Sequence, residues 1–129
     1  MNINDNEFVN SLVYQKFIEN NPGKGYLKIR AYAASEALPV VGLRIIVSSL
    51  IENEKVIFFD GITDDSGMID TLTLPTPKLD NSNLEIPLTI NYSVEAIKDT
   101  INKKFSVDMY DGVCVFQNIN FVPGGNNVS

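Results

Sequence analysis

Apolar and polar residues alternate along most of the chain from Tyr26 onward, which is typical of β-strands with one buried and one exposed face. In the segment 26–32, three apolar residues alternate with Lys28, Arg30 and Tyr32. The other strands that this pattern predicts are 43–48, 56–59, 68–74, 90–96, 105–109 and 113–122. Strands this short, with turn signals between them, predict an all-β fold, a seven-stranded Greek-key β-sandwich.

Turn-forming residues separate the predicted strands. Asn53-Glu54 predicts a hairpin turn, and Asp111-Gly112 is the strongest hairpin signal in the chain. Pro75 should end its strand, because proline cannot donate a ladder hydrogen bond. Residues 78–88 read as a long surface crossover. The segment 56–59 is apolar on both faces, which predicts a central strand or a strand with a covered outer face.

Residues 1–24 follow a different pattern. Asn4 and Glu7 have the spacing of a capping box, and apolar residues at helical intervals predict a short N-terminal α-helix over 5–19. Pro22 and the adjacent glycines should end the helix and form a joint. The predicted organisation is a helical arm with its Gly/Pro joint over 1–24, a β-sandwich domain over 25–123 and a flexible tail over 124–129. The apolar stripe of the helix consists of Phe8, Val9, Leu12, Val13 and Phe17.

This stripe needs a surface to pack on, because so short a helix is only marginally stable alone. One interpretation is that the helix folds onto its own sandwich and covers Ile57 and Phe59. The other is that it docks on a neighbouring subunit or a partner protein. Exposed sheet edges offer a second route to association, by strand addition. The five residues of the stripe are therefore the candidates for protein interaction.

Composition argues against several classes of function. The chain of 129 residues fits one domain, and its net charge of −6 argues against a nucleic-acid partner. It has no histidine, the commonest general base and metal ligand. Cys114 is the only cysteine, so neither an internal disulfide nor a cysteine-based zinc site can form. We therefore expect no enzyme activity, no catalytic residue and no cofactor. Cys114 lies in an apolar run, which predicts a buried, inert thiol.

The N-terminal segment is acidic and lacks the basic and apolar regions of a secretory signal. The chain also lacks an apolar run of the length that spans a bilayer. We therefore expect a protein that is cytoplasmic at synthesis and does not span a membrane.

Five motifs succeed one another along the chain: Gly25-Tyr-Leu-Lys-Ile-Arg-Ala31, Pro39-x-x-Gly42-Leu-Arg-Ile45, Thr63-Asp-x-x-Gly67, Leu74-Pro75 and Tyr92-x-Val94. In these motifs the chain resembles carboxypeptidase-regulatory-like domains, which have a transthyretin-like (prealbumin-like) β-sandwich. The end of the chain, Tyr110-Asp-Gly-Val113 and 117–123, is similar to a variant seen in Firmicutes cell-wall and spore-associated proteins. The resemblance implies a non-catalytic structural or protein-interaction module, a component of a bacterial spore or cell-envelope assembly. The chain departs from the pattern at 96–100, where such domains commonly carry a Gly-Tyr pair.

Four carboxylates around one turn are weak candidates for calcium, which prefers oxygen ligands. They are Asp60, Asp64, Asp65 and Asp70. Their spacing does not match a calcium-binding loop, and Asp and Ser before a glycine are also what a tight turn needs. We favour the turn and predict no metal. A module that binds carbohydrate or peptidoglycan is the alternative function, with Tyr32 and Tyr110 as rings on which sugars could stack.

Sandwich domains of surface pili that are similar to this one form internal Lys–Asn isopeptide bonds. The residue types are present in Lys28, Glu95 and either Asn118 or Asn120. The bond requires that all three be buried together. Lys28 and Glu95 each lie between two apolar residues in the sequence, and Ile119 and Phe121 flank the asparagines, so the alternation turns each candidate toward water. We therefore do not expect the bond.

Overall fold

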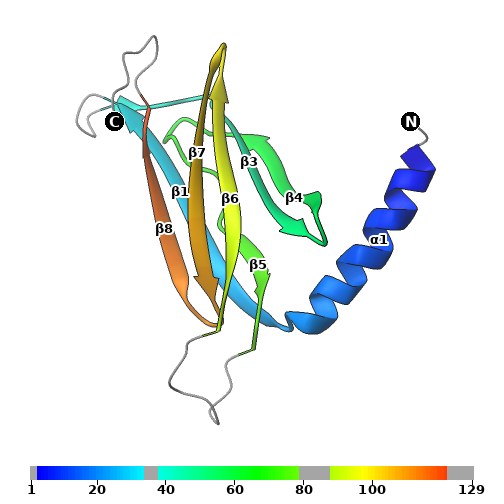
Figure 1. Ribbon diagram of the computed structural model, residues 1–129. Helices are drawn as coiled ribbons and strands as arrows, with labels where there is room; N and C mark the ends of the chain where they lie inside the picture. Colours follow the sequence, from blue (N-terminus) through cyan, green and yellow to red (C-terminus); the bar gives the residue numbers. More distant parts are fainter. Residues whose placement is uncertain (1–2, 34–37, 79–87, 122–129) are drawn as a thin grey trace.

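The structure, a computed structural model, describes residues 3–33, 38–78 and 88–121, and side chains from residue 12 onward. Within these ranges the elements in chain order are α1 (Ile3–Asn20), β1 (Gly23–Ala33), β2 (Leu38–Pro39), β3 (Arg44–Ile51), β4 (Glu54–Ile62), β5 (Leu72–Thr76), β6 (Thr89–Lys98), β7 (Ile101–Tyr110) and β8 (Cys114–Asn120). The strands form two sheets, and α1 leaves the sandwich at one end (Figure 1). The all-β sandwich with one N-terminal helix is confirmed, and the two-residue β2 is a strand beyond the seven that were predicted.

The first sheet is built around β1. Along one edge β1 pairs antiparallel with β5 near its start and with β2 at its end, and along the other edge it pairs in parallel with β8. The second sheet has the order β4-β3-β6-β7, and all its neighbours are antiparallel. β7 and β8 are therefore consecutive in the chain but belong to different sheets.

The core lies between the two sheets, as the alternation predicts. Leu27, Ile29 and Ala31 of β1 are fully buried, while the residues between them face outward. The apolar residues of the other strands and of the positions next to them that are fully buried as well are Leu43, Ile45, Val47, Tyr92, Val94, Ala96, Met109, Ile119 and Phe121. The period of two along each strand thus sets which side chains form the core.

β4 is an edge strand, so of the two alternatives predicted for 56–59 the central strand is wrong. Ser48 of β3 pairs with Ile57, but Val47 pairs with Phe59, so Phe58 is an extra residue, a β-bulge. Strict alternation would place Phe58 and Phe59 on opposite faces of the sheet. Because of the bulge, both pack against the core, while Ile57 remains exposed. The bulge therefore explains how a segment apolar at every position fits an edge strand.

β5 begins later than the predicted strand over 68–74 and does not end at Pro75. Met68 makes only an isolated bridge with Arg30, and Pro75 lies inside β5 opposite Lys24. β5 pairs with β1 alone, so it is an edge strand. A proline is tolerated there because its missing donor can face away from the neighbouring strand.

Asp111-Gly112 does form a tight turn, but the turn is not a hairpin. The Val113 amide donates to the Tyr110 carbonyl at 3.2 Å, and Gly112 has φ +77, which favours glycine. The chain then crosses to the first sheet, where β8 runs parallel to β1. Cys114 starts β8 on its outward face and is exposed, so the prediction of a buried thiol is wrong.

Several boundaries differ from the predicted ones by a few residues. α1 begins at Ile3, so Asn4 lies within the helix and does not cap it. β1 begins at Gly23, which leaves only residues 21–22 between helix and strand. The β3–β4 turn is Glu52-Asn53, where both residues have positive φ, as a type I′ hairpin requires. The tail over 124–129 and residues 79–87 of the predicted crossover lie outside the described residues.

Candidate functional site

The junction between α1 and the sandwich is an aromatic cluster. Phe17 is buried, and its ring centroid lies 5.7 Å from that of Phe58. The Tyr14 ring lies 5.6 Å from Phe58 on the same helical face. Phe58 in turn meets Tyr92 edge to face at 5.3 Å. The helix therefore packs on its own sandwich through Phe58, the residue that the bulge supplies, and not through Ile57, which is exposed.

Tyr92 connects this cluster to both sheets. It lies on β6 of the second sheet, its side chain is fully buried, and its hydroxyl donates to the Pro75 carbonyl of β5 in the first sheet. Burial, with a smaller contribution from Tyr14, raises the pKa of Tyr92 far above its ordinary value, so the phenol stays protonated and keeps its donor. The phenol acts here as a structural donor and not as an acid.

The end of α1 is fixed by Asn21. Its amide nitrogen Nδ2 donates to the Phe17 carbonyl at 2.9 Å, and its backbone amide donates to the Ile18 carbonyl at 3.1 Å. These bonds satisfy two of the carbonyls that a helix C-terminus leaves open. Pro22 follows and cannot continue the helix. The helix thus ends where the sequence predicts, in a defined turn.

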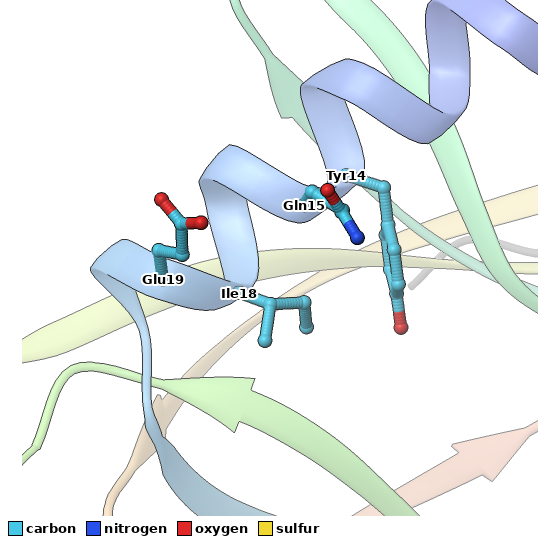
Figure 2. A pocket seen from close by; sticks show the side chains of 4 residues that line it. All are labelled: Tyr14, Gln15, Ile18 and Glu19. Carbon is cyan, nitrogen blue, oxygen red and sulfur yellow. The ribbon is translucent and has the colours of Figure 1, made fainter.

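Two hollows flank this junction. One, of about 410 Å³, is lined by Tyr14, Gln15, Ile18 and Glu19 (Figure 2). Figure 2 shows Tyr14 and Ile18 on the same side of the helix and Glu19 on the other. A smaller one, of about 170 Å³, lies between this end of α1 and β5. Both are open to solvent, and neither brings together groups that could catalyse a reaction.

The predicted interaction stripe divides into two parts. Phe17 is buried, and Val13 is half-buried and packed against the core. Leu12 is 56% exposed. The side chains of Phe8 and Val9 lie outside the described part of the chain. The C-terminal half of the stripe is thus used within the chain, and Leu12 is the described member that remains open.

The four acidic residues proposed for calcium do not form one site. Asp60 makes a two-pronged ion pair with Arg44, at 2.9 and 2.7 Å, and this hydrogen bonding lowers the pKa of Asp60. The Asp64 carboxylate accepts from the amides of Ser66 and Met68 at 2.8 and 3.0 Å, which closes the turn. Asp65 and Asp70 are exposed. Among the described residues, no three acidic or cysteine side chains lie close enough to hold a metal ion.

Thr63 and Gly67 show why the turn between β4 and β5 requires these residue types. The buried Thr63 hydroxyl donates to the Val40 carbonyl at 2.6 Å and accepts from the Leu43 amide at 3.0 Å. Gly67 has φ +75, and a Cβ there would lie 2.3 Å from the Ala31 carbonyl oxygen. The Thr63-Asp64-x-x-Gly67 motif therefore holds the crossing from the second sheet to the first.

The residues considered for an isopeptide bond lie on opposite faces of the sandwich. Lys28 and Asn118 face outward from the first sheet, and Glu95 faces outward from the second. Glu95 is nevertheless buried, contrary to prediction. It pairs with Lys55 Nζ at 2.7 Å, and this bond lowers the pKa of Glu95 against the opposing effect of burial. With the core between Lys28 and Glu95, this fold does not allow the bond.

A basic and aromatic surface on the first sheet was not predicted. Parallel pairing places Lys28 beside Phe116 and Tyr32 beside Asn120 on one outward face. Where this face meets β7, a groove of about 460 Å³ opens. The residues that line it are Tyr32, Lys103, Lys104, Phe105, Asn118 and Asn120. The alternation marked Lys28 and Tyr32 as outward, but the strand beside them could not be read from the sequence.

Solved structures show the same fold at low sequence identity. The Bacillus anthracis TIE protein matches with 20% identity and a TM-score of 0.53, over 76% of this chain and 16% of that protein. GBS52, the minor pilin of Streptococcus agalactiae, matches with 14% identity and a TM-score of 0.52, over 83% of this chain and 48% of that one. Transthyretin from Sparus aurata is more distant, with 16% identity and a TM-score of 0.46, over 70% of this chain and 85% of that one.

These likenesses confirm the transthyretin-like β-sandwich and concern the fold alone. The chain spans less than half of the TIE protein and of GBS52. No protein-family model matches the chain, and no curated protein matches it. In the described part of the chain, no helix combines the length and the apolar character that a bilayer crossing requires.

Proposed function

We propose that the chain is a non-catalytic module for structure and protein interaction, and that it associates with a second copy or a partner protein through α1. The observation that carries the proposal is that the described side chains which pack α1 on the sandwich, Val13, Phe17 and Ile18, lie toward its C-terminal end, while Leu12 is open. Figure 1 shows the N-terminal part of the helix extending away from the strands. Leu12, at the start of the described side chains, is 56% exposed. A helical segment of this length gains stability mainly by packing, so a free apolar face favours association.

The setting of such a module is a larger assembly of a spore or cell envelope. Two facts support this part of the proposal: the motifs of the sequence and the fold shared with a minor pilin. The edge strands β4, β7 and β8 expose backbone groups to which another chain could add a strand, which is the second route to association.

Light scattering over a concentration series tests the role of the helix in the full chain. We expect Leu12→Glu to shift association to higher concentration, because it places a charge on the open face of α1 while sparing the buried Phe17. Leu38→Glu is the matched control, since Leu38 is similarly exposed at 59% but lies on β2. If the unaltered chain is monomeric at every concentration and pull-downs recover no partner, the proposal fails. If Leu38→Glu is the variant that blocks association, the sheet edge and not the helix is the interface.

A further inference from the structure

Side-chain packing near the C-terminal end of α1 holds this helix on the sandwich. The rings of Tyr14 and Phe17 meet the Phe58 ring of β4, with centroids 5.6 and 5.7 Å apart. Ile18 packs against the same core. The hydrogen bonds that Asn21 donates run back to the carbonyls of Phe17 and Ile18, so they stay within the end of the helix. α1 can therefore leave the sandwich with these bonds intact.

The joint between α1 and β1 consists of two residues, Asn21 and Pro22. β1 begins at Gly23, which is already paired with Thr76 of β5. Pro22 has a fixed φ and favours an extended conformation at Asn21. A joint so short and stiff allows few conformations in which the chain folds back on itself, and this favours the exchange of a terminal element between copies. Phe17 lies about one helical turn before the joint, so the surface that receives it is close to the joint as well.

The surface of the sandwich that receives α1 requires a helix to cover it. Phe58 lies between the helix and Tyr92, which it meets edge to face at 5.3 Å. Phe17 is buried, so departure of α1 would bring the rings of Phe17 and Phe58 into water. Because α1 also depends on packing for its stability, a helix that has left its own sandwich is stable only on an equivalent surface. Another protein would need to match the helical spacing of Tyr14, Phe17 and Ile18, whereas a second copy has the identical helix and the identical surface.

We propose that two copies of the chain exchange α1, so that the helix of each copy packs on Phe58 and beside Tyr92 of the other. This exchange rests on the function proposed above, because it takes α1 as the element of association, and it names the partner as a second copy. Each exchanged helix makes the contacts that it makes in the single chain, so no new complementary surface is required. The pair has two-fold symmetry, because each copy gives one helix and receives one.

Apolar side chains that are open in the single chain lie on both sides of this junction. On the helix Leu12 and Tyr14 are 56% and 40% exposed, and on β4 Ile57, the residue before Phe58, is 52% exposed. Exchange brings the junctions of two copies together, because each joint is only two residues long. These side chains then gain a second copy on which to pack, which they lack when α1 closes on its own sandwich. The exchanged pair is therefore favoured as the protein concentration rises.

Isotope-filtered NMR on a mixture of labelled and unlabelled full-length chains tests the exchange. Equal amounts of the two are unfolded together, refolded, and concentrated until light scattering shows dimers. We expect nuclear Overhauser effects between the Phe17 ring of one chain and the Phe58 ring of the other, because the two ring centroids lie 5.7 Å apart. The exchange is overturned if, in a dimeric sample, the effects between these two rings occur only within one chain.

Two variants with complementary defects give a second test. Phe17→Ala weakens the helix and leaves the receiving surface intact, whereas Phe58→Ala weakens the surface and leaves the helix intact. Neither variant alone can form a complete junction, but a mixed pair has one complete junction if the helices are exchanged. Native mass spectrometry of the mixture should show mixed dimers outnumbering each kind of identical dimer about tenfold, where random pairing gives about twofold. Random pairing in the mixture would overturn the exchange.

Leu12→Glu separates failure of the exchange from failure of the function proposed above. If the unaltered chain forms dimers that Leu12→Glu weakens, while the effects between Phe17 and Phe58 stay within one chain, α1 is an interface and its exchange is overturned. If the unaltered chain is monomeric up to about 1 mM, both the exchange and association through α1 are overturned. The NMR measurement uses the unaltered chain, so it decides the matter even where a variant does not fold.

Discussion

The charged side chains on the two outward faces of the sandwich have different kinds of neighbour. The second sheet carries two ion pairs between its strands, Arg44 with Asp60 and Lys55 with Glu95. On the first sheet the cations of β1 lie beside aromatic rings, and the strands of that sheet supply no carboxylate. Both sheets contribute alike to one core. The difference between them therefore lies outside the core, on the surfaces that meet solvent or a ligand.

This contrast separates charges that are held in ion pairs across neighbouring strands from cations that lie beside aromatic rings. A charge bonded to a partner across neighbouring strands stabilises the sheet and offers little to a ligand, because binding would first have to break the pair. A cation beside an exposed ring gains only about 0.5–1 kcal/mol from that contact. We therefore expect equivalent substitutions to have unequal effects on the free energy of unfolding, according to the face on which they are made.

The largest loss of stability should come from the turn that joins the two sheets. Gly67→Ala places a Cβ 2.3 Å from the backbone oxygen of Ala31 and keeps the residue at φ +75. Neither backbone can move without disturbing β1, so we expect a loss of about 3 kcal/mol in the free energy of unfolding. Chemical denaturation followed by circular dichroism measures this loss.

Gly112→Ala is the matched control for this effect. Gly112 has nearly the same φ, +77, but a Cβ there would meet nothing within 4 Å. Its cost should be only that of the left-handed backbone, about 1 kcal/mol. Equal losses in the two variants would show that the close approach of Gly67 to Ala31 does not determine the effect.

On the second sheet we expect Glu95→Gln to lower the free energy of unfolding by an intermediate amount that depends on pH. The pKa of Glu95 is lowered in the folded protein, mainly by the bond from Lys55. A lowered pKa means that the charged form stabilises the fold at neutral pH and that this contribution is lost as the pH falls through the folded-state pKa. The variant should lose about 1–2 kcal/mol at pH 7 relative to the parent.

The pH profile distinguishes this charge effect from a packing effect. The difference between parent and variant should shrink in acid, because Glu95 is then protonated and resembles the glutamine in charge. Unfolding midpoints measured across the acidic range give this profile. A difference that stays constant from neutral pH into acid would mean that the ion pair contributes nothing and that only shape is lost.

The local sequence pattern predicts which side chains of a strand face the core, but it does not predict which strands lie beside it. Alternation correctly placed Leu27 and Ile29 inside and Lys28 outside. It could not show that Lys55 would reach Glu95, forty residues away in the sequence, because that contact depends on the order of strands in the sheet. For the same reason the local pattern wrongly predicted that Glu95 is exposed and that Cys114 is buried.

The bulge in β4 and the parallel pairing of β8 could not be predicted from the local sequence pattern either. An apolar run such as 56–59 fits a central strand or a bulged edge strand equally well, and only the pairing with β3 decides between them. Asp111-Gly112 correctly signals a tight turn, but the same turn can close a hairpin or lead the chain into the opposite sheet. The outward face that β1 and β8 share arises from that second choice, since it requires the two strands to be neighbours.

The most direct test of the contrast is to replace one lysine by glutamine on each face. On the first sheet this change should have the smallest effect on stability. Lys28→Gln removes a cation that contacts only the ring of Phe116 among the interactions described, so we expect the free energy of unfolding to change by less than about 0.5 kcal/mol. Lys55→Gln is the same change on the second face, where it leaves the buried Glu95 without its charged partner, and should cost about 1–2 kcal/mol. If Lys28→Gln destabilises the protein as much as Lys55→Gln does, the cations of the first sheet serve the fold as well, and the division between the two faces fails.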